Sequence, residues 1–130
     1  MGYAAHILVV EDEPLIQKLI RRALAADGYS VTAVGTARQA LENIQNATFD
    51  VVVLDMSLPD EDGIETLRQI RADAPYTPVV AISGMMVSPM RRAARAAGAQ
   101  ATLSKPMRFE KLRDAVSGLA KPDRLHAACA

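Results

Sequence analysis

Four short apolar runs in this sequence each lead directly into a polar residue that can carry chemistry. The runs cover residues 6–10, 50–54, 78–82 and 101–104, and they lead into Glu11 with Asp12, into Asp55, into Ser83 and into Lys105, respectively. Open α/β sheets keep their chemistry at the carboxyl ends of their parallel strands. We therefore expect these side chains to meet at one sheet edge, as a site for Mg²⁺ and a phosphoryl group.

Helical patterns alternate with the apolar runs. Helices are expected from about residue 14 to 28, 37 to 46, 63 to 74, 88 to 98 and 109 to 119, with a further strand at 30–34 and Thr36 as the cap of the second helix. This alternation is typical of right-handed βαβ units. It predicts a flavodoxin-like, doubly wound α/β fold with five helices and five parallel strands in the order 2-1-3-4-5. Since the first and third strands are neighbours in that order, Asp12 should lie beside Asp55.

Length and composition favour one domain in a reducing compartment. We assign residues 1–120 to the domain and 121–130 to a short C-terminal tail that is expected to be frayed. Fifteen basic residues balance fifteen acidic ones, and no apolar stretch approaches the ~20 residues that span a bilayer. The single cysteine, Cys129, cannot form an internal disulfide. We expect a cytoplasmic protein that binds neither membrane nor DNA directly.

Several classes of site are disfavoured by what the sequence does not contain. No glycine-rich loop follows the first apolar run, which argues against a dinucleotide site or a P-loop. Neither a Ser-His-Asp arrangement nor a zinc-ligand spacing is present. The two histidines, His6 and His126, lie at the ends of the chain, and we expect both to face solvent.

Taken together, the strand-end motifs resemble the receiver domain of two-component response regulators. The resemblance runs from about residue 7 to residue 119 and is carried by Glu11-Asp12, Asp55, Leu58-Pro59, Asp62-Gly63, Ser83-Gly84 and Lys105-Pro106. Each motif alone is weak. All of them in this order, each at a strand end or in the loop that follows, form a specific signal.

The resemblance implies that Asp55 is the phosphoacceptor and that Mg²⁺ is the cofactor. Asp12 and Asp55 would bind the metal directly, the backbone carbonyl of Ser57 would add a third ligand, and Glu11 would act through water. Crowded carboxylates repel one another, and a hard divalent cation relieves that repulsion. Taken alone, Glu11 and Asp12 also fit a pair of acids that stabilises the start of a helix.

The resemblance also implies roles for a hydroxyl and a lysine. Ser83 would donate a hydrogen bond to the phosphoryl group, although a serine before a glycine also suits an ordinary turn. Lys105 would pair with the carboxylate at rest and with a phosphoryl oxygen afterwards, although a surface lysine at a strand end is the simpler alternative. In the family the bond between this lysine and Pro106 is cis, which proline tolerates.

The implied function is that of a phosphoacceptor signalling domain rather than an enzyme, one that assists its own phosphorylation and autodephosphorylation. A histidine kinase or histidine phosphotransfer protein would donate to Asp55, and an unknown downstream protein would read the changed surface. Passing the phosphoryl group onward, as a phosphorelay shuttle, is an alternative. A haloacid-dehalogenase-type phosphohydrolase is a disfavoured alternative, because that class needs a second acid two residues after the nucleophile and Ser57 stands there. A receiver-like binding module that takes no phosphate is also disfavoured, because Asp12, Asp55 and Lys105 are all present and such a module would not need them.

One departure from the family affects how the signal is read. Receivers usually carry Tyr or Phe three residues before the lysine, and here that residue is Thr102. Four methionines (Met85, Met86, Met90 and Met107) and three arginines (Arg91, Arg92 and Arg95) lie in the sequence around it. We expect a basic, methionine-lined output face on the fourth helix, fifth strand and fifth helix, suited to an acidic partner.

Overall fold

The computed structural model describes residues 4–120, which form one parallel sheet of five strands. The strands are β1 (His6–Val10), β2 (Ser30–Val34), β3 (Val51–Asp55), β4 (Val79–Ser83) and β5 (Ala101–Ser104), in the order β2-β1-β3-β4-β5. The predicted order and parallel pairing are confirmed. Because β1 and β3 are neighbours, the loops that follow them leave the sheet side by side.

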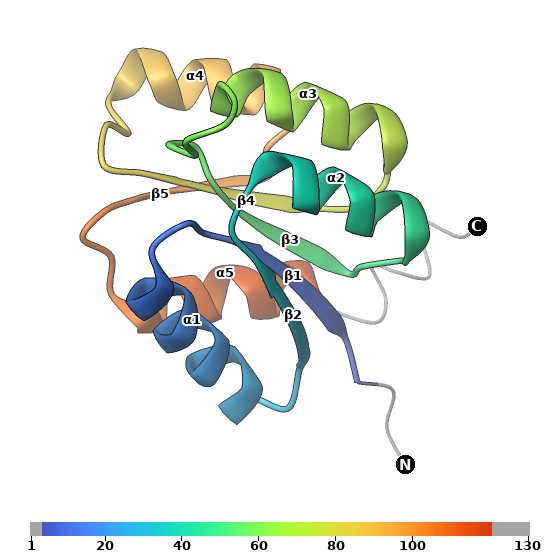
Figure 1. The fold of residues 1–130 in the computed structure, drawn as a ribbon. Helices are drawn as coiled ribbons and strands as arrows, with labels where there is room; N and C mark the ends of the chain where they lie inside the picture. Colours follow the sequence, from blue (N-terminus) through green and yellow to red (C-terminus); the bar gives the residue numbers. More distant parts are fainter. Residues whose placement is uncertain (1–3, 121–130) are drawn as a thin grey trace.

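Helices cover both faces of the sheet, as the crossover rule requires. They are α1 (Pro14–Ala26), α2 (Ala37–Asn46), α3 (Gly63–Asp73), α4 (Ser88–Ala96) and α5 (Phe109–Leu119). Figure 1 shows α1 and α5 on one face and α2, α3 and α4 on the other. None of these helices has the length and apolar character needed to cross a membrane.

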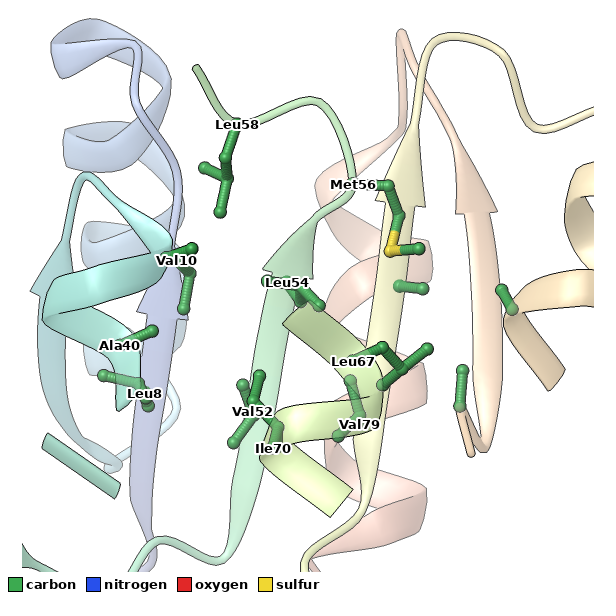
Figure 2. Close-up of a cluster of buried hydrophobic side chains, with 14 of the residues drawn as sticks. Leu8, Val10, Ala40, Val52, Leu54, Met56, Leu58, Leu67, Ile70 and Val79 are labelled. Carbon is green, nitrogen blue, oxygen red and sulfur yellow. The ribbon is translucent and has the colours of Figure 1, made fainter. Parts of the chain in front are cut away.

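The alternation of side chains along each strand divides the interior into two cores. In β1, Leu8 and Val10 point to the core under α2, α3 and α4, whereas Ile7 and Val9 point to the core under α1 and α5. Figure 2 shows the first core, in which Leu8 lies among other fully buried aliphatic side chains. Burial on both faces explains why the strands read as continuous apolar runs.

Local signals set the ends of the helices. Pro14 begins α1, and the Thr36 hydroxyl accepts a hydrogen bond from the Gln39 amide at 3.1 Å, which confirms the predicted cap of α2. Gly28 and Gly98 follow α1 and α4 with φ of 93° and 116°, a conformation that other residues rarely adopt. The third strand begins one residue later than predicted.

The start of β1 is bound to the residue that precedes β3. The Asp50 carboxylate accepts a hydrogen bond from the His6 amide at 2.8 Å. The expectation that His6 faces solvent is wrong: it is half-buried, its Nε2 lies 2.7 Å from the Thr32 hydroxyl, and its ring contacts Phe49. The predictions for His126, Cys129 and the tail at 121–130 fall outside the described residues.

Candidate functional site

Three carboxylates meet at the carboxyl edge of the sheet. Asp55 ends β3, and Glu11 and Asp12 begin the loop that follows β1. One oxygen from each lies within 4.8 Å of the others. Glu11 and Asp55 are only 1% and 2% exposed, whereas Asp12 is open to solvent. The cluster therefore has two buried members and one that faces the outside.

Lys105 reaches this cluster from the end of β5, the outermost strand of the sheet. It follows β5, its bond to Pro106 is cis as predicted, and its Nζ donates to Glu11 Oε1 at 3.0 Å and to Asp55 Oδ2 at 3.1 Å. Asp55 Oδ1 accepts the backbone N–H of Ser57 at 2.9 Å. Both oxygens of the predicted phosphoacceptor are thus held by donors, which fixes the orientation of the carboxylate.

Burial and charge act against each other in this cluster. Burial raises the pKa of Glu11 above its usual value, hydrogen bonds from the Glu13 amide and Lys105 oppose that rise, and the charge of Asp55 adds to it. For Lys105, burial is the largest single effect and would lower the pKa, but the hydrogen bonds to Glu11 and Asp55 together with the charges of these two carboxylates outweigh it, and the pKa is raised. Lys105 therefore stays protonated, yet a single ammonium balances only one of three carboxylates.

Ser83 ends the strand next to that of Asp55. In the register of β3 and β4, Asp55 pairs with Ile82, so Ser83 extends one residue further at the same edge. Its side chain is buried, and its Oγ accepts the backbone N–H of Met85 at 3.0 Å. Because that bond uses an oxygen lone pair, the hydroxyl keeps its own proton to donate elsewhere.

The loop after β3 is held in place by contacts that sequence reasoning missed. The Asp60 carboxylate accepts the N–H groups of Ala37 at 3.0 Å and Arg38 at 3.1 Å, and so caps α2 from across the fold. At Gly63, an added Cβ would lie 2.4 Å from the Met56 carbonyl oxygen, so only glycine allows this approach. A Pro-Asp pair is an ordinary turn signal, and nothing local marks Asp60 as the cap of another helix.

A second missed contact lies on α4. Arg91 Nη1 donates to the Thr102 hydroxyl at 3.0 Å and its Nη2 donates to the Met86 carbonyl at 3.1 Å. Arg91 is half-buried, whereas Arg92 and Arg95 are exposed. Both terminal nitrogens of the Arg91 guanidinium are therefore bound to acceptors within the protein itself.

The four methionines do not form one surface. Met86 is buried, Met90 packs against the same core, and Met107 packs against the core on the opposite face of the sheet. Met85 is 69% exposed in the loop after β4. Of the predicted methionine lining, Met107 alone lines a hollow between β5, α4 and α5, while Met86 and Met90 fill gaps in the core.

The fold and this edge define a class: flavodoxin-like α/β proteins with an acidic, lysine-containing site where the strands end. Residues 7–117 match the family described as the response regulator receiver domain, and the chain belongs to that family. Receivers are signalling domains in which phosphorylation and magnesium binding are general features. The resemblance stated from the sequence motifs is therefore confirmed.

Similar proteins include regulators with and without further domains. The transcriptional regulatory protein TcrA of Mycobacterium tuberculosis is 37% identical over 106 residues, which cover 82% of this chain and 42% of TcrA. The chain thus spans less than half the length of that relative. The chemotaxis response regulator CheY4 of Vibrio cholerae superposes with a TM-score of 0.84 at 27% identity, covering 90% of this chain and 99% of CheY4.

A third similar protein contains a metal. The receiver domain of the sensor histidine kinase PA1611 of Pseudomonas aeruginosa has a TM-score of 0.82 and 29% identity, covering 91% of this chain and 98% of that one. Its structure has a magnesium ion coordinated in the active-site cleft. In the present chain, Glu11, Asp12 and Asp55 form the matching kind of acidic cluster.

Proposed function

We propose that Asp55 accepts a phosphoryl group in a Mg²⁺-dependent reaction from a histidine kinase or histidine phosphotransfer protein, and that this switches a partner-binding surface. The observation that carries the proposal is the lysine bridge. Lys105 Nζ contacts both Glu11 and Asp55 inside a cluster of three carboxylates. A carboxylate can act as a phosphoryl nucleophile only where positive charge offsets its own charge and that of the incoming group.

The donor atoms of the cluster suit Mg²⁺. Three carboxylate oxygens within 4.8 Å of one another, balanced by one ammonium, form a hard and electron-rich site. Asp12, Asp55 and the Ser57 carbonyl would hold the ion directly, and Glu11 would hold it through water. The bound ion would supply charge neutralisation for the carboxylates and for the phosphoryl oxygens.

The protein's own groups account for the remaining requirements of transfer. An oxygen of Asp55 forms the new bond to phosphorus while the bond from phosphorus to the donor's imidazole nitrogen breaks. The Ser57 amide already holds one oxygen of Asp55 in a fixed direction. Lys105 can exchange its bond to Asp55 for one to a phosphoryl oxygen, and Ser83 can donate its hydroxyl proton to another.

The direct test is phosphorylation by a small-molecule donor. With acetyl phosphate and Mg²⁺, intact-mass spectrometry should show one phosphoryl group on the wild-type protein, none on Asp55→Asn, and none on the wild type when EDTA removes the metal. Asp73→Asn is the matched control, because it makes the same change on the surface of α3. Undiminished uptake by Asp55→Asn would show that another residue is the acceptor.

The output surface proposed here is the face of α4, β5 and α5. A hollow of about 600 Å³ opens on it, and its lining includes Arg91, Arg108 and Lys111. Arg92 and Arg95 add exposed positive charge on α4. This face would attract an acidic partner surface, since complementary charge speeds association and selects partners.

A further inference from the structure

Arg91 links three separate parts of the structure through its side chain. It lies in the first half of α4, its Nη1 bonds to Thr102 in β5, and its Nη2 bonds to the Met86 carbonyl in the loop between β4 and α4. Thr102 is 8% exposed, and its hydroxyl accepts the Arg91 bond at 3.0 Å. The arginine thus holds the loop against the edge strand.

The chemistry of the guanidinium suits this task. Its N–H groups are fixed in one plane, so two acceptors can be held at a set separation by one side chain. A hydrogen bond from a charged donor is also stronger than one between neutral groups. A lysine would keep the charge at this position but could not hold Thr102 and the Met86 carbonyl in the same fixed geometry.

The other end of the same loop is tied to the candidate site. Ser83 Oγ accepts the Met85 amide at 3.0 Å, and Met86, the next residue, is the one that Arg91 holds. If the Ser83 oxygen itself moves toward a phosphoryl group on Asp55 in order to donate its proton, its bond to the Met85 amide is stretched or broken. The loop then moves, and the Met86 carbonyl moves with it.

We propose that Arg91 is a latch that keeps the loop at residues 84–88 bound to Thr102 while Asp55 is unmodified, and that phosphorylation releases it. This inference rests on the proposed function. Thr102 stands where receivers usually carry an aromatic ring. In this protein the side chain of Arg91 connects Thr102 to the loop at residues 84–88. An interaction present in only one state favours that state, so its removal favours the other.

The test measures binding of beryllofluoride, a phosphoryl mimic, in the presence of Mg²⁺. Arg91→Ala and Arg91→Lys should each bind it about fivefold more tightly than the wild type, or better, because neither variant keeps the resting contacts. In the protein without the mimic, amide hydrogen exchange over residues 84–88 should be faster in both variants. The control is Arg68→Ala, which removes an exposed arginine from α3 and should change neither quantity.

A second variant separates the latch from a general loss of stability. Thr102→Val removes the acceptor on β5 with almost no change in shape, and it should also tighten beryllofluoride binding. Because Thr102→Val and Arg91→Ala break the same bond, their effects should not add in the double variant. Additive effects, or Arg91 variants with wild-type binding and exchange, would overturn the latch.

Failure of the proposed function gives a different result. A wild-type protein that does not respond to beryllofluoride would overturn the phosphoacceptor proposal, and with it the coupling assigned to Arg91. A normal wild-type response that the Arg91 and Thr102 variants share unchanged would overturn the latch alone. Thermal unfolding of each variant establishes that the binding data refer to folded protein.

Discussion

At the scale of single residues, the site holds the Asp55 carboxylate firmly, but the loops around it offer few groups that could orient a water molecule. Asp55 is fixed by Lys105 and by the Ser57 amide. The two side chains that by family resemblance flank the path of an attacking water are Ser57 and Met85. Neither carries a carboxylate or amide that could orient the water for attack on phosphorus. We therefore expect a comparatively long-lived phosphorylated state.

This lifetime is tested by replacing Met85. Met85→Glu should hasten the loss of phosphate from Asp55 by about tenfold, because a carboxylate at this exposed position can position and deprotonate the water. The measurement is the decay of phosphorylated protein after the donor is removed. Val87→Glu places the same charge on the same loop, two residues further along, and should leave the decay unchanged. A Met85→Glu protein that loses phosphate at the wild-type rate contradicts the prediction.

At the scale of elements, we expect α1 to carry the surface that the phosphoryl donor contacts. Leu15 is 66% exposed at the start of this helix, close in sequence to Glu11 and Asp12. Lys18 and Arg22 follow it at helical spacing and are also exposed. An exposed leucine beside basic residues, near the site, suits contact with a helix of a partner that carries the phosphorylated histidine.

Leu15→Asp should separate protein donors from small-molecule donors. Transfer from the partner should slow by about tenfold, since burying a leucine contributes roughly 1.5–3 kcal/mol. Labelling by acetyl phosphate should not change. Tyr76→Asp is the control, because Tyr76 is also well exposed, at 76%, but precedes β4 at the opposite end of the strands. Equal losses with both donors would indicate a folding defect in place of a lost contact.

The capping of α2 by Asp60 predicts a specific response to acid. Hydrogen bonds from the amides of Ala37 and Arg38 lower the pKa of Asp60 below its usual value, with burial opposing them. A carboxyl group with a lowered pKa contributes stability that is present above the pKa of the unfolded chain and is lost as the pH falls through the folded value. The contribution should therefore be full at neutral pH, begin to fall near about pH 4, and be lost as the pH drops through the lower pKa of the folded protein.

Chemical denaturation across that range measures the effect. Asp60→Ala should lower the free energy of unfolding at pH 7 by about 1 kcal/mol, the usual value of a helix cap, and the difference from wild type should shrink toward pH 3. Asp114→Ala removes an exposed carboxylate from α5 and should not show this pattern. A difference that stays constant with pH would mean that Asp60 acts through packing instead of charge.

The elements of this fold could be predicted from local sequence signals, whereas the hydrogen bonds between distant residues could not. Apolar runs, Pro14, Thr36 and the glycines at 28 and 98 are local signals, and they predicted the strands, helices and sheet order. The predicted cluster of Glu11, Asp12, Asp55 and Lys105 followed, because parallel strands bring their ends together. The hydrogen bonds of Asp60 and Arg91 join residues that are 23 and 11 positions apart, and no periodic pattern encodes such pairings.

At the scale of the whole molecule, phosphorylation should change the structure mainly on the side of the sheet that carries α4. The Ser83 hydroxyl, the loop at 84–88 and α4 form a continuous path away from Asp55. Chemical-shift changes of backbone amides on adding beryllofluoride and Mg²⁺ should therefore concentrate between residues 83 and 98. Changes that cluster on α1 and spare this segment would favour a phosphorelay shuttle that uses one surface for donor and acceptor.

The lysine bridge at the sheet edge has a consequence for synthesis of the protein. Glu11 and Lys105 are 94 positions apart in the chain, and Lys105 follows the last strand of the sheet. A chain emerging from the ribosome already contains Asp55 and its acidic neighbours well before the lysine that offsets their charge is made. Until β5 docks, Asp55 lacks the ammonium that offsets the repulsion between its own charge and that of an incoming phosphoryl group. If Asp55 is the phosphoacceptor, as proposed, competence to receive the signal is acquired only once β5 has docked.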